Sequence, residues 1–277
     1  MRWVKMIKHI FSDMDGTLLN NACQISDGNV RAIEDSQIPF TLVSARSPKE
    51  MVEVIDKLHL TEPQIGFNGG LIFKKVDGEI QPLKSETIEF SEVKRIIQIV
   101  KDEFKLTSYS FYDLNNWYVE KLDRGIEYEI KMGGQTPTVT DFAPLFEQEL
   151  SVFKIMLITF DETEMKKLVT KLNKFNPGNL SIYQSTPTYL EITSTKAQKH
   201  LGIEYIKNLE DLQTSELAAF GDGLNDLSML QNVGTPIVME NGFESLKKHA
   251  KYITKDNEHD GVAYGIKQYL LNEKTGI

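Results

Sequence analysis

Short apolar runs alternate with amphipathic helical segments near both ends of the chain. Residues 6–12 (MIKHIFS) and 39–44 (PFTLVS) are strand-like runs in the first part, and residues 217–220 (LAAF) and 236–239 (PIVM) are strand-like runs in the last. A strand–helix–strand order favours a parallel sheet whose crossover helices cover its faces. The pattern therefore predicts an α/β fold whose parallel-sheet core is built from both ends of the chain.

The middle of the chain has a different pattern. Two amphipathic helices, predicted at 91–104 and 162–175, lie among several strand-like runs such as TSYSFYDL and SVFKIMLITF. Several strands with few helices are typical of a small α+β domain. We therefore predict an α/β core formed by residues 1–81 and 191–277, with an inserted domain at 82–190.

Composition and charge exclude several classes of protein. The 277 residues carry a net charge of -9 with no strongly basic stretch, so nucleic acid is not expected as a partner. No apolar run approaches the ~20 residues of a membrane-spanning helix, and no signal peptide is recognisable, so we expect a cytoplasmic protein without a membrane partner. Cys23 is the single cysteine, which excludes an internal disulfide. Neither length nor charge indicates an oligomeric state.

Polar residues follow the strand-like runs at the points where ligands bind in parallel sheets. Asp13 and Asp15 follow the first run, Ser44 follows the second, and Asp222 and Asp226 lie in GDGLND after LAAF. The carboxyl ends of parallel strands meet at one edge of a sheet, so these side chains should converge. Carboxylates gathered in a small space need a counter-charge, and Mg²⁺ shared with a substrate phosphate would supply it.

Such a pocket suits phosphoryl transfer, although spacing alone also allows a surface turn. One carboxylate can attack a phosphoryl group while a second moves protons, which would explain the pair Asp13 and Asp15. The calcium-loop pattern fails because residue 17 is Thr and no acidic residue follows in register. GDGLND ends in Asp instead of Gly, which argues against dinucleotide binding, and no P-loop motif is present.

Four segments in order resemble the signatures of the haloacid dehalogenase (HAD) superfamily. They are DMDGTLL at 13–19, VSAR at 43–46, EITSTKAQKH at 191–200 and GDGLND at 221–226. NGGLI at 68–72 and NEHDGVA at 257–263 resemble further patterns of the Cof-type branch, also called subfamily IIB. The resemblance covers the chain from end to end. It implies a Rossmann-like core with an inserted C2-type cap domain that sets substrate specificity.

The resemblance also implies roles for individual residues. Asp13 would be the nucleophile and a Mg²⁺ ligand, and Asp15 would be the general acid/base and offer its backbone carbonyl to the metal. Lys199 would neutralise Asp13 and the phosphoryl group, although Lys196 is a competing candidate. Ser44 would hold the phosphate. The remaining candidates are Asp222 as a direct metal ligand, Asp226 as a metal ligand through water or a support for one, and the substrate-binding residues Ala45, Arg46, Asn68 and Asn225.

Three departures from the family pattern leave the catalytic groups in place. Ser44-Ala45 stands for the usual Thr-Gly, His200 for a Gly, and Glu240 lies where Met-Gly-Asn is usual, before Asn241. We predict a Mg²⁺-dependent phosphatase acting on small phosphorylated metabolites, with sugar phosphates first and flavin mononucleotide or pyridoxal phosphate next. The alternatives are a phosphomutase of the same fold and a non-catalytic protein that binds phosphorylated metabolites.

Overall fold

The computed structural model describes residues 6–271, which form two compact units. The first unit comprises the described parts of Met1–Ala45, Met51–Lys84 and Gln198–Ile277, and the second comprises Arg46–Glu50 and Ser85–Ala197. The main divisions therefore fall at 84/85 and 197/198, a few residues beyond the expected 81/82 and 190/191. The first unit contains a five-stranded and a three-stranded sheet, and the second contains a six-stranded sheet.

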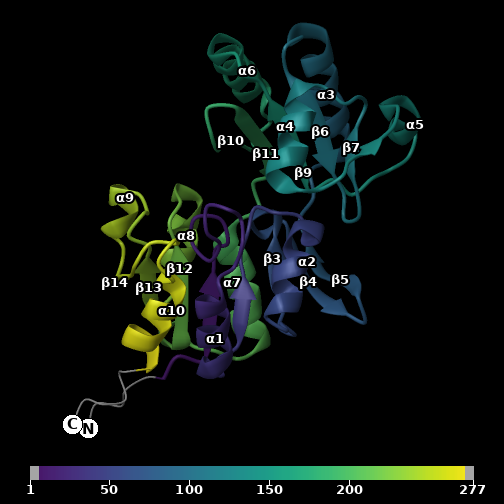
Figure 1. Cartoon of the computed structure of the whole chain (residues 1–277). Coiled ribbons are helices and arrows are strands. Elements are labelled where there is room, and N and C mark those ends of the chain that lie inside the picture. The colour runs from purple at the N-terminus through teal and green to yellow at the C-terminus, as the bar shows by residue number, and fades with distance from the viewer. Residues whose placement is uncertain (1–5, 272–277) are drawn as a thin grey trace, which may run out of the picture. The chain divides into compact units, whose positions relative to one another are not determined.

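The first unit is built around a five-stranded sheet with the order β14-β13-β12-β1-β2, and every neighbouring pair is parallel. The central strand β1 (His9–Ser12) lies between β2 (Phe40–Leu42) and β12 (Leu217–Gly221), and its register pairs His9 with Leu217. β13 (Thr235–Val238) and β14 (Tyr252–Ile253) complete the sheet. The parallel α/β core predicted from the two ends of the chain is thus confirmed (Figure 1).

Helices cover this sheet. α1 (Asp27–Ser36) begins where the Ser26 hydroxyl accepts a hydrogen bond from the Asn29 N–H, and it packs against α10 (Gly261–Gly265) and the following π-helical turn η4 (Ile266–Leu271). α7 (Lys199–Leu209) buries Ile203 and Ile206 in one cluster with Phe11 of β1. The other helical segments are α2 (Pro48–Lys57), α8 (Leu227–Leu230), α9 (Glu244–Lys247) and the 3₁₀ turns η1 (Phe67–Gly69), η2 (Thr214–Glu216) and η3 (Leu224–Asp226).

A small second sheet in this unit was not anticipated from the sequence. β3 (Gln64–Gly66), β4 (Leu71–Val76) and β5 (Glu79–Ser85) form three strands in that order. Asp77 and Gly78 join β4 to β5 with positive φ angles of 52° and 87°, which is the geometry of a tight hairpin turn. A parallel bridge between Val43 and Ile65 places β3 beside the end of β2.

The second unit has a six-stranded sheet of order β10-β11-β9-β6-β7-β8, in which β7 and β8 are parallel and the other pairs antiparallel. The helices α3 (Phe90–Glu103) and α6 (Glu162–Phe175) pack on it through an apolar cluster that includes Ile97, Phe111 and Leu168. Both helices were predicted, whereas α4 (Arg124–Gly133), capped by Asp123, was not. The remaining elements are β6 (Ser108–Tyr112), β7 (Trp117–Val119), β8 (Thr138–Val139), α5 (Phe142–Phe146), β9 (Lys154–Ile158), β10 (Leu180–Gln184) and β11 (Tyr189–Ser194).

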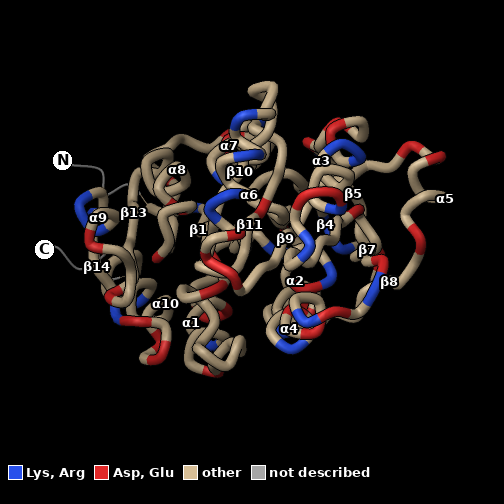
Figure 2. Tube along the Cα trace, turned by 90° about the horizontal axis from the view of Figure 1, so that it is seen from above, with Lys and Arg blue, Asp and Glu red and all other residues tan. Residues whose placement is uncertain are grey.

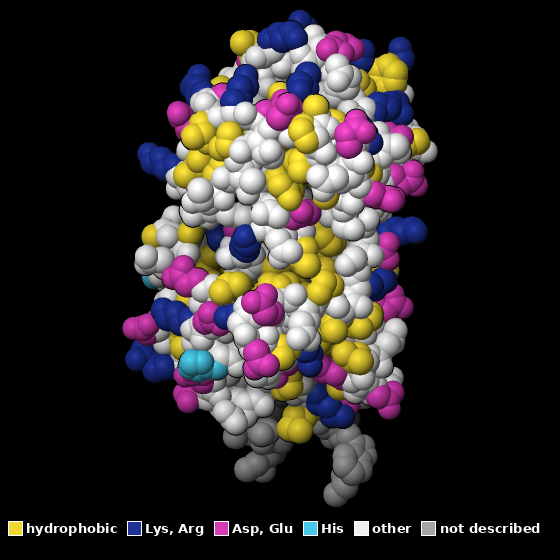
Figure 3. All heavy atoms as spheres, turned by 90° about the vertical axis from the view of Figure 1, so that its right-hand side faces the viewer, with side chains coloured by type: hydrophobic (Ala, Val, Ile, Leu, Met, Phe, Trp, Pro, Cys, Tyr) yellow, Lys and Arg dark blue, Asp and Glu magenta, His cyan; other side chains and the backbone are white. Residues whose placement is uncertain are grey.

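Charges of both signs are distributed along both units. Figure 2 shows Lys and Arg interspersed with Asp and Glu along the chain, and the face in Figure 3 mixes apolar, acidic and basic side chains. Among residues 6–271, no helix is both long and apolar enough to cross a membrane.

Candidate active site

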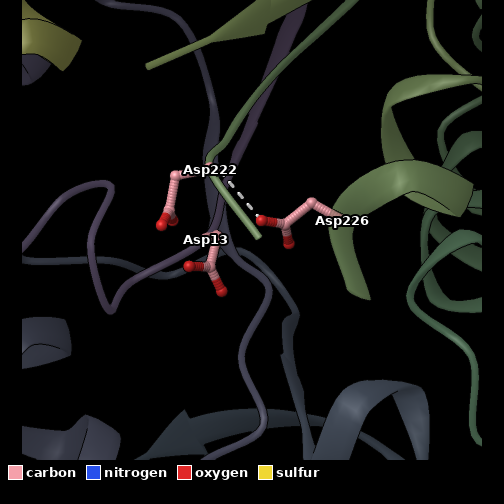
Figure 4. A group of neighbouring side chains, drawn as sticks. All are labelled: Asp13, Asp222 and Asp226. Atoms are coloured by element: carbon pink, nitrogen blue, oxygen red, sulfur yellow. Dashed lines mark hydrogen bonds between the residues drawn. The ribbon is translucent and has the colours of Figure 1, made fainter. Parts of the chain in front are cut away.

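Three carboxylates meet at one edge of the parallel sheet. Asp13 directly follows β1, and its N–H donates to the Phe220 carbonyl of β12 at 3.0 Å, so the two strands stay paired up to the site. Asp222 directly follows β12, and Asp226 ends η3. One carboxylate oxygen from each of the three lies within 4.8 Å of the others (Figure 4). The predicted convergence is confirmed for these three carboxylates, whereas Asp15, which was expected among them, is not part of the group.

Lys199, the first residue of α7, supplies a positive charge to this group. Its Nζ donates to Asp13 Oδ1 at 2.5 Å and to Asp226 Oδ1 at 2.6 Å, and the side chain is almost completely buried. Lys196, the competing candidate, is exposed to solvent. The structure therefore assigns the counter-charge to Lys199.

Asp226 organises the backbone that carries Asp222. Its second oxygen, Oδ2, accepts hydrogen bonds from the N–H groups of Asp222 at 3.0 Å and Gly223 at 2.9 Å. The residue is fully buried, and both of its oxygens are thus engaged by protein donors. This arrangement fits the supporting role among the two that were expected for Asp226.

The negative charge of the group exceeds what Lys199 neutralises. Burial, followed by the Asp226 charge, raises the pKa of Asp13 well above its ordinary value, and Lys199 opposes this rise. Burial raises the pKa of Asp222 to about 6, although the hydrogen bond from Thr17 lowers it. Clustered carboxylates beside one ammonium are a hard oxygen donor set with surplus negative charge. Asp13 and Asp222 thus fit a divalent cation such as Mg²⁺.

The turn after Asp13 is shaped around Asp222. Gly16 has φ +77°, and a Cβ at this position would lie 2.5 Å from Asp222 Oδ2. The Thr17 hydroxyl donates to Asp222 Oδ1 at 2.7 Å. Sequence reasoning did not assign Gly16 or Thr17 a role, although both lie within the segment DMDGTLL. A glycine is needed here because the carboxylate occupies the space of a side chain and because φ is positive.

Asp15 occupies a different position from the other acidic residues. Its side chain is exposed and is not one of the three gathered carboxylates. An exposed carboxyl two residues after the buried Asp13 is suited to meet a substrate oxygen, which is what a general acid/base requires. The contribution of its backbone carbonyl to a metal stays a prediction.

The other candidates form a second group in the first unit. Ser44 is buried after β2, its N–H donates to Ile65 O at 2.9 Å, and its carbonyl accepts from the Asn68 N–H at 2.8 Å. Asn68 has φ 57°, and its Oδ1 faces Asn225 Nδ2 at 3.4 Å.

The structure also places Ala45, Arg46 and His200, which the sequence analysis singled out. Ala45 is half-buried in the first unit, whereas Arg46 belongs to the second. His200 follows Lys199, and its buried Nδ1 has no hydrogen-bond partner among the described residues. Roles for Ala45 and Arg46 stay predictions.

This fold and site define a class of enzyme. An open parallel sheet brings three carboxylates and a buried lysine that contacts two of them to its carboxyl edge, which is where α/β enzymes bind ligands. The model of the haloacid dehalogenase-like hydrolase family matches residues 10–266. The chain therefore belongs to that family.

Similar proteins agree with this assignment over nearly their whole length. A putative phosphatase of Haemophilus influenzae is 30% identical over 273 residues, covering 97% of this chain and 98% of the relative. A 5-amino-6-(5-phospho-D-ribitylamino)uracil phosphatase of Bacillus subtilis is 26% identical over 289 residues, covering 96% and 99%. The structure of a haloacid dehalogenase-like hydrolase from Bacteroides thetaiotaomicron matches with a TM-score of 0.85 at 27% identity, covering 94% and 98%. The expected family, fold class and enzyme class, a phosphatase, are confirmed.

Proposed function

We propose that this phosphatase hydrolyses small phosphorylated metabolites with the help of Mg²⁺, through an aspartyl-phosphate on Asp13. The observation that carries the proposal is the contact of the buried Lys199 ammonium with both Asp13 and Asp226, beside Asp222. Lys199 lowers the pKa of Asp13 against the effect of burial, which favours the ionised carboxylate, and is positioned to neutralise charge on a transferring phosphoryl group. Bound at Asp13 and Asp222, Mg²⁺ would supply further positive charge to the phosphoryl oxygens.

The proposed reaction has two steps. A carboxylate oxygen of Asp13 forms a bond to phosphorus while the bond from phosphorus to the ester oxygen breaks, and Asp15 gives a proton to that leaving oxygen. Asp15 then takes a proton from water, whose oxygen attacks the phosphorus of the aspartyl-phosphate and releases phosphate and free Asp13. General acid–base catalysis of this kind contributes about 10²- to 10⁴-fold.

The phosphoryl acceptor separates the candidate functions. The relatives named phosphatases support transfer to water, whereas a phosphomutase would return the phosphoryl group to the sugar. The named substrate of the Bacillus subtilis relative carries its phosphate on a ribityl chain. We therefore propose a phosphate ester on a polyol or sugar chain as substrate, with flavin mononucleotide and pyridoxal phosphate next. We also propose that the second unit is the cap that selects the leaving group.

The test is phosphate release from a panel of sugar phosphates, flavin mononucleotide and pyridoxal phosphate, with Mg²⁺ or with a chelator. Asp13→Asn should abolish release while the circular dichroism spectrum stays unchanged. Asp35→Asn, an exposed position in α1, is the matched control and should behave as wild type. Substantial turnover by Asp13→Asn would reject Asp13 as the nucleophile. Isomer formation without phosphate release would favour the phosphomutase.

Asp15 is tested by the acidity of the leaving group. Asp15→Asn should slow alkyl phosphates by about 10²-fold or more, because their leaving oxygen needs a proton. The first step with 2,4-dinitrophenyl phosphate should change little, because that phenolate leaves without protonation. Bursts of released alcohol or phenolate, measured by rapid mixing, follow this step directly. Equal slowing of both esters in that step would remove Asp15 from the role of general acid.

A further inference from the structure

Two asparagines from the C-terminal part of the chain hold the turn that carries Asp15. Asn241 lies after β13, and its Nδ2 donates to the Gly16 carbonyl at 2.8 Å. Asn257 lies after β14, and its Nδ2 donates to the Leu19 carbonyl at 2.9 Å. The turn is thus held at a carbonyl on each side of Thr17, from segments more than 200 residues away in sequence.

The two asparagines are also joined to each other. Asn241 Oδ1 accepts a hydrogen bond from the backbone N–H of Asn257 at 3.2 Å. The Asn241 amide therefore donates to one backbone group and accepts from another. A backbone carbonyl can only accept and a backbone N–H can only donate, so the amide cannot be reversed. An aspartate has the same shape but no donor, and its carboxylate would face the Gly16 carbonyl. Only an amide side chain of this length satisfies both contacts.

The segment that carries Asn241 is anchored at the Asp222 end of β12. The Met239 N–H donates to Gly221 O and the Phe243 N–H donates to Asp222 O, each at 3.1 Å. The segment 239–243 thus connects the backbone around Asp222 with the turn around Asp15. This connection is independent of the direct hydrogen bond from Thr17 to Asp222.

We propose that Asn241 and Asn257 are positioning residues that set where Asp15 lies relative to Asp13 and Asp222. This inference rests on the proposed function, because it assigns the asparagines an effect through the general acid. Asp13 is held by β1 and by Lys199, so its placement does not depend on the two asparagines. Their loss should therefore impair proton transfer to the leaving oxygen more than the attack by Asp13.

The test compares two esters in the same first-step assay. The quantity measured is the ratio of the first-step rate with an alkyl phosphate to the first-step rate with 2,4-dinitrophenyl phosphate. This ratio should be at least about tenfold lower in Asn241→Asp and in Asn257→Asp than in wild type. Asp15→Asn should lower the same ratio. Both rates come from one enzyme sample, so the ratio does not change with the fraction folded. Asn173→Asp in α6 is the matched control, because Asn173 Nδ2 also donates to a backbone carbonyl, Val169 O, at 2.9 Å.

The possible outcomes are distinguishable. A reduced ratio in Asn241→Asp and Asn257→Asp, with an unchanged ratio in Asn173→Asp, supports the positioning role. An unchanged ratio in the first two variants, while Asp15→Asn lowers it, overturns this inference and leaves the proposed function standing. An unchanged ratio in Asp15→Asn overturns the general-acid assignment and this inference with it. An equal loss with both esters identifies a structural role and also overturns the inference.

Discussion

Replacing Lys199 by methionine should destabilise the first unit strongly at neutral pH. Methionine fills a similar volume, and volume-conserving changes in a core cost less than about 1.5 kcal/mol by packing alone. The larger effect is electrostatic, because Asp13 and Asp226 would lose the ammonium that lies 2.5 and 2.6 Å away. Removing one partner from a buried ion pair costs about 3–5 kcal/mol. At about 2–4 °C per kcal/mol, the melting temperature should fall by roughly 6–20 °C.

The penalty should depend on pH. Burial lowers the pKa of Lys199, but the charges of Asp13 and Asp226 raise it by more, so the pKa lies above its ordinary value. The ammonium therefore stays charged, and continues to stabilise the fold, throughout pH 5–8. In the variant, Asp13 loses the ammonium that lowers its pKa, so the repulsion among the buried carboxylates is relieved when Asp13 binds a proton. The difference in free energy of unfolding should therefore be largest near pH 7.5 and shrink toward pH 5.

Differential scanning calorimetry is the suitable assay because it measures the melting temperature directly. The control is Lys196→Met, which makes the same change at an exposed position three residues earlier and should alter the free energy of unfolding by less than about 0.5 kcal/mol. If Lys199→Met were as stable as Lys196→Met at pH 7.5, the electrostatic account of this site would be wrong.

Two further predictions concern Asp222 and the turn beside it. The pKa of Asp222 is about 6 in the metal-free fold, above the ordinary 3.8, so between these values the folded protein binds a proton that the unfolded chain has lost. The free energy of unfolding should therefore fall as pH rises from about 4 to 6, by at most about 3 kcal/mol. Urea unfolding in a chelator should show this loss, and Mg²⁺ should restore stability above pH 6; a flat profile in the chelator would contradict the shift. Gly16→Ala should abolish phosphatase activity, whereas Gly78→Ala, with a similar φ of +87° but no atom within 4 Å of the new Cβ, should lose only about 1–2 kcal/mol of stability and no activity. Equal activity in the two alanine variants would show that the turn tolerates displacement of Asp222.

Much of the site could be predicted because its residues directly follow strands. Asp13, Ser44 and Asp222 each follow an apolar run, and parallel strands bring their carboxyl ends to one edge whatever the length of the intervening chain. The same rule could not separate Asp15 from the acidic group. Whether a carboxylate is buried depends on the course of the turn, which here is set by Gly16 and by distant partners.

The parts that were missed depend on contacts between distant residues or on short local signals. Asn241 and Asn257 donate to a turn more than 200 residues away, and although NEHDGVA at 257–263 resembles a family pattern, it does not reveal these partners. By contrast, the hairpin of β4 and β5 had a signal in Asp77-Gly78, a dipeptide that favours two-residue turns. The helix α4 had one in its N-cap Asp123.

The position of the second unit within the chain has a consequence for biosynthesis. The central strand β1 pairs with β12, and 205 residues separate Thr17 from its hydrogen-bond partner Asp222. The ribosome therefore delivers the whole of 85–197, with all strands of the six-stranded sheet, before it delivers Lys199 or β12. The second unit can therefore fold before the sheet of the first unit is complete, although N-terminal domains usually fold first during synthesis. A nascent or truncated chain that ends before Lys199 would carry Asp13 without its counter-charge, so phosphatase activity would begin only after Lys199, β12 and Asp222 have been synthesised.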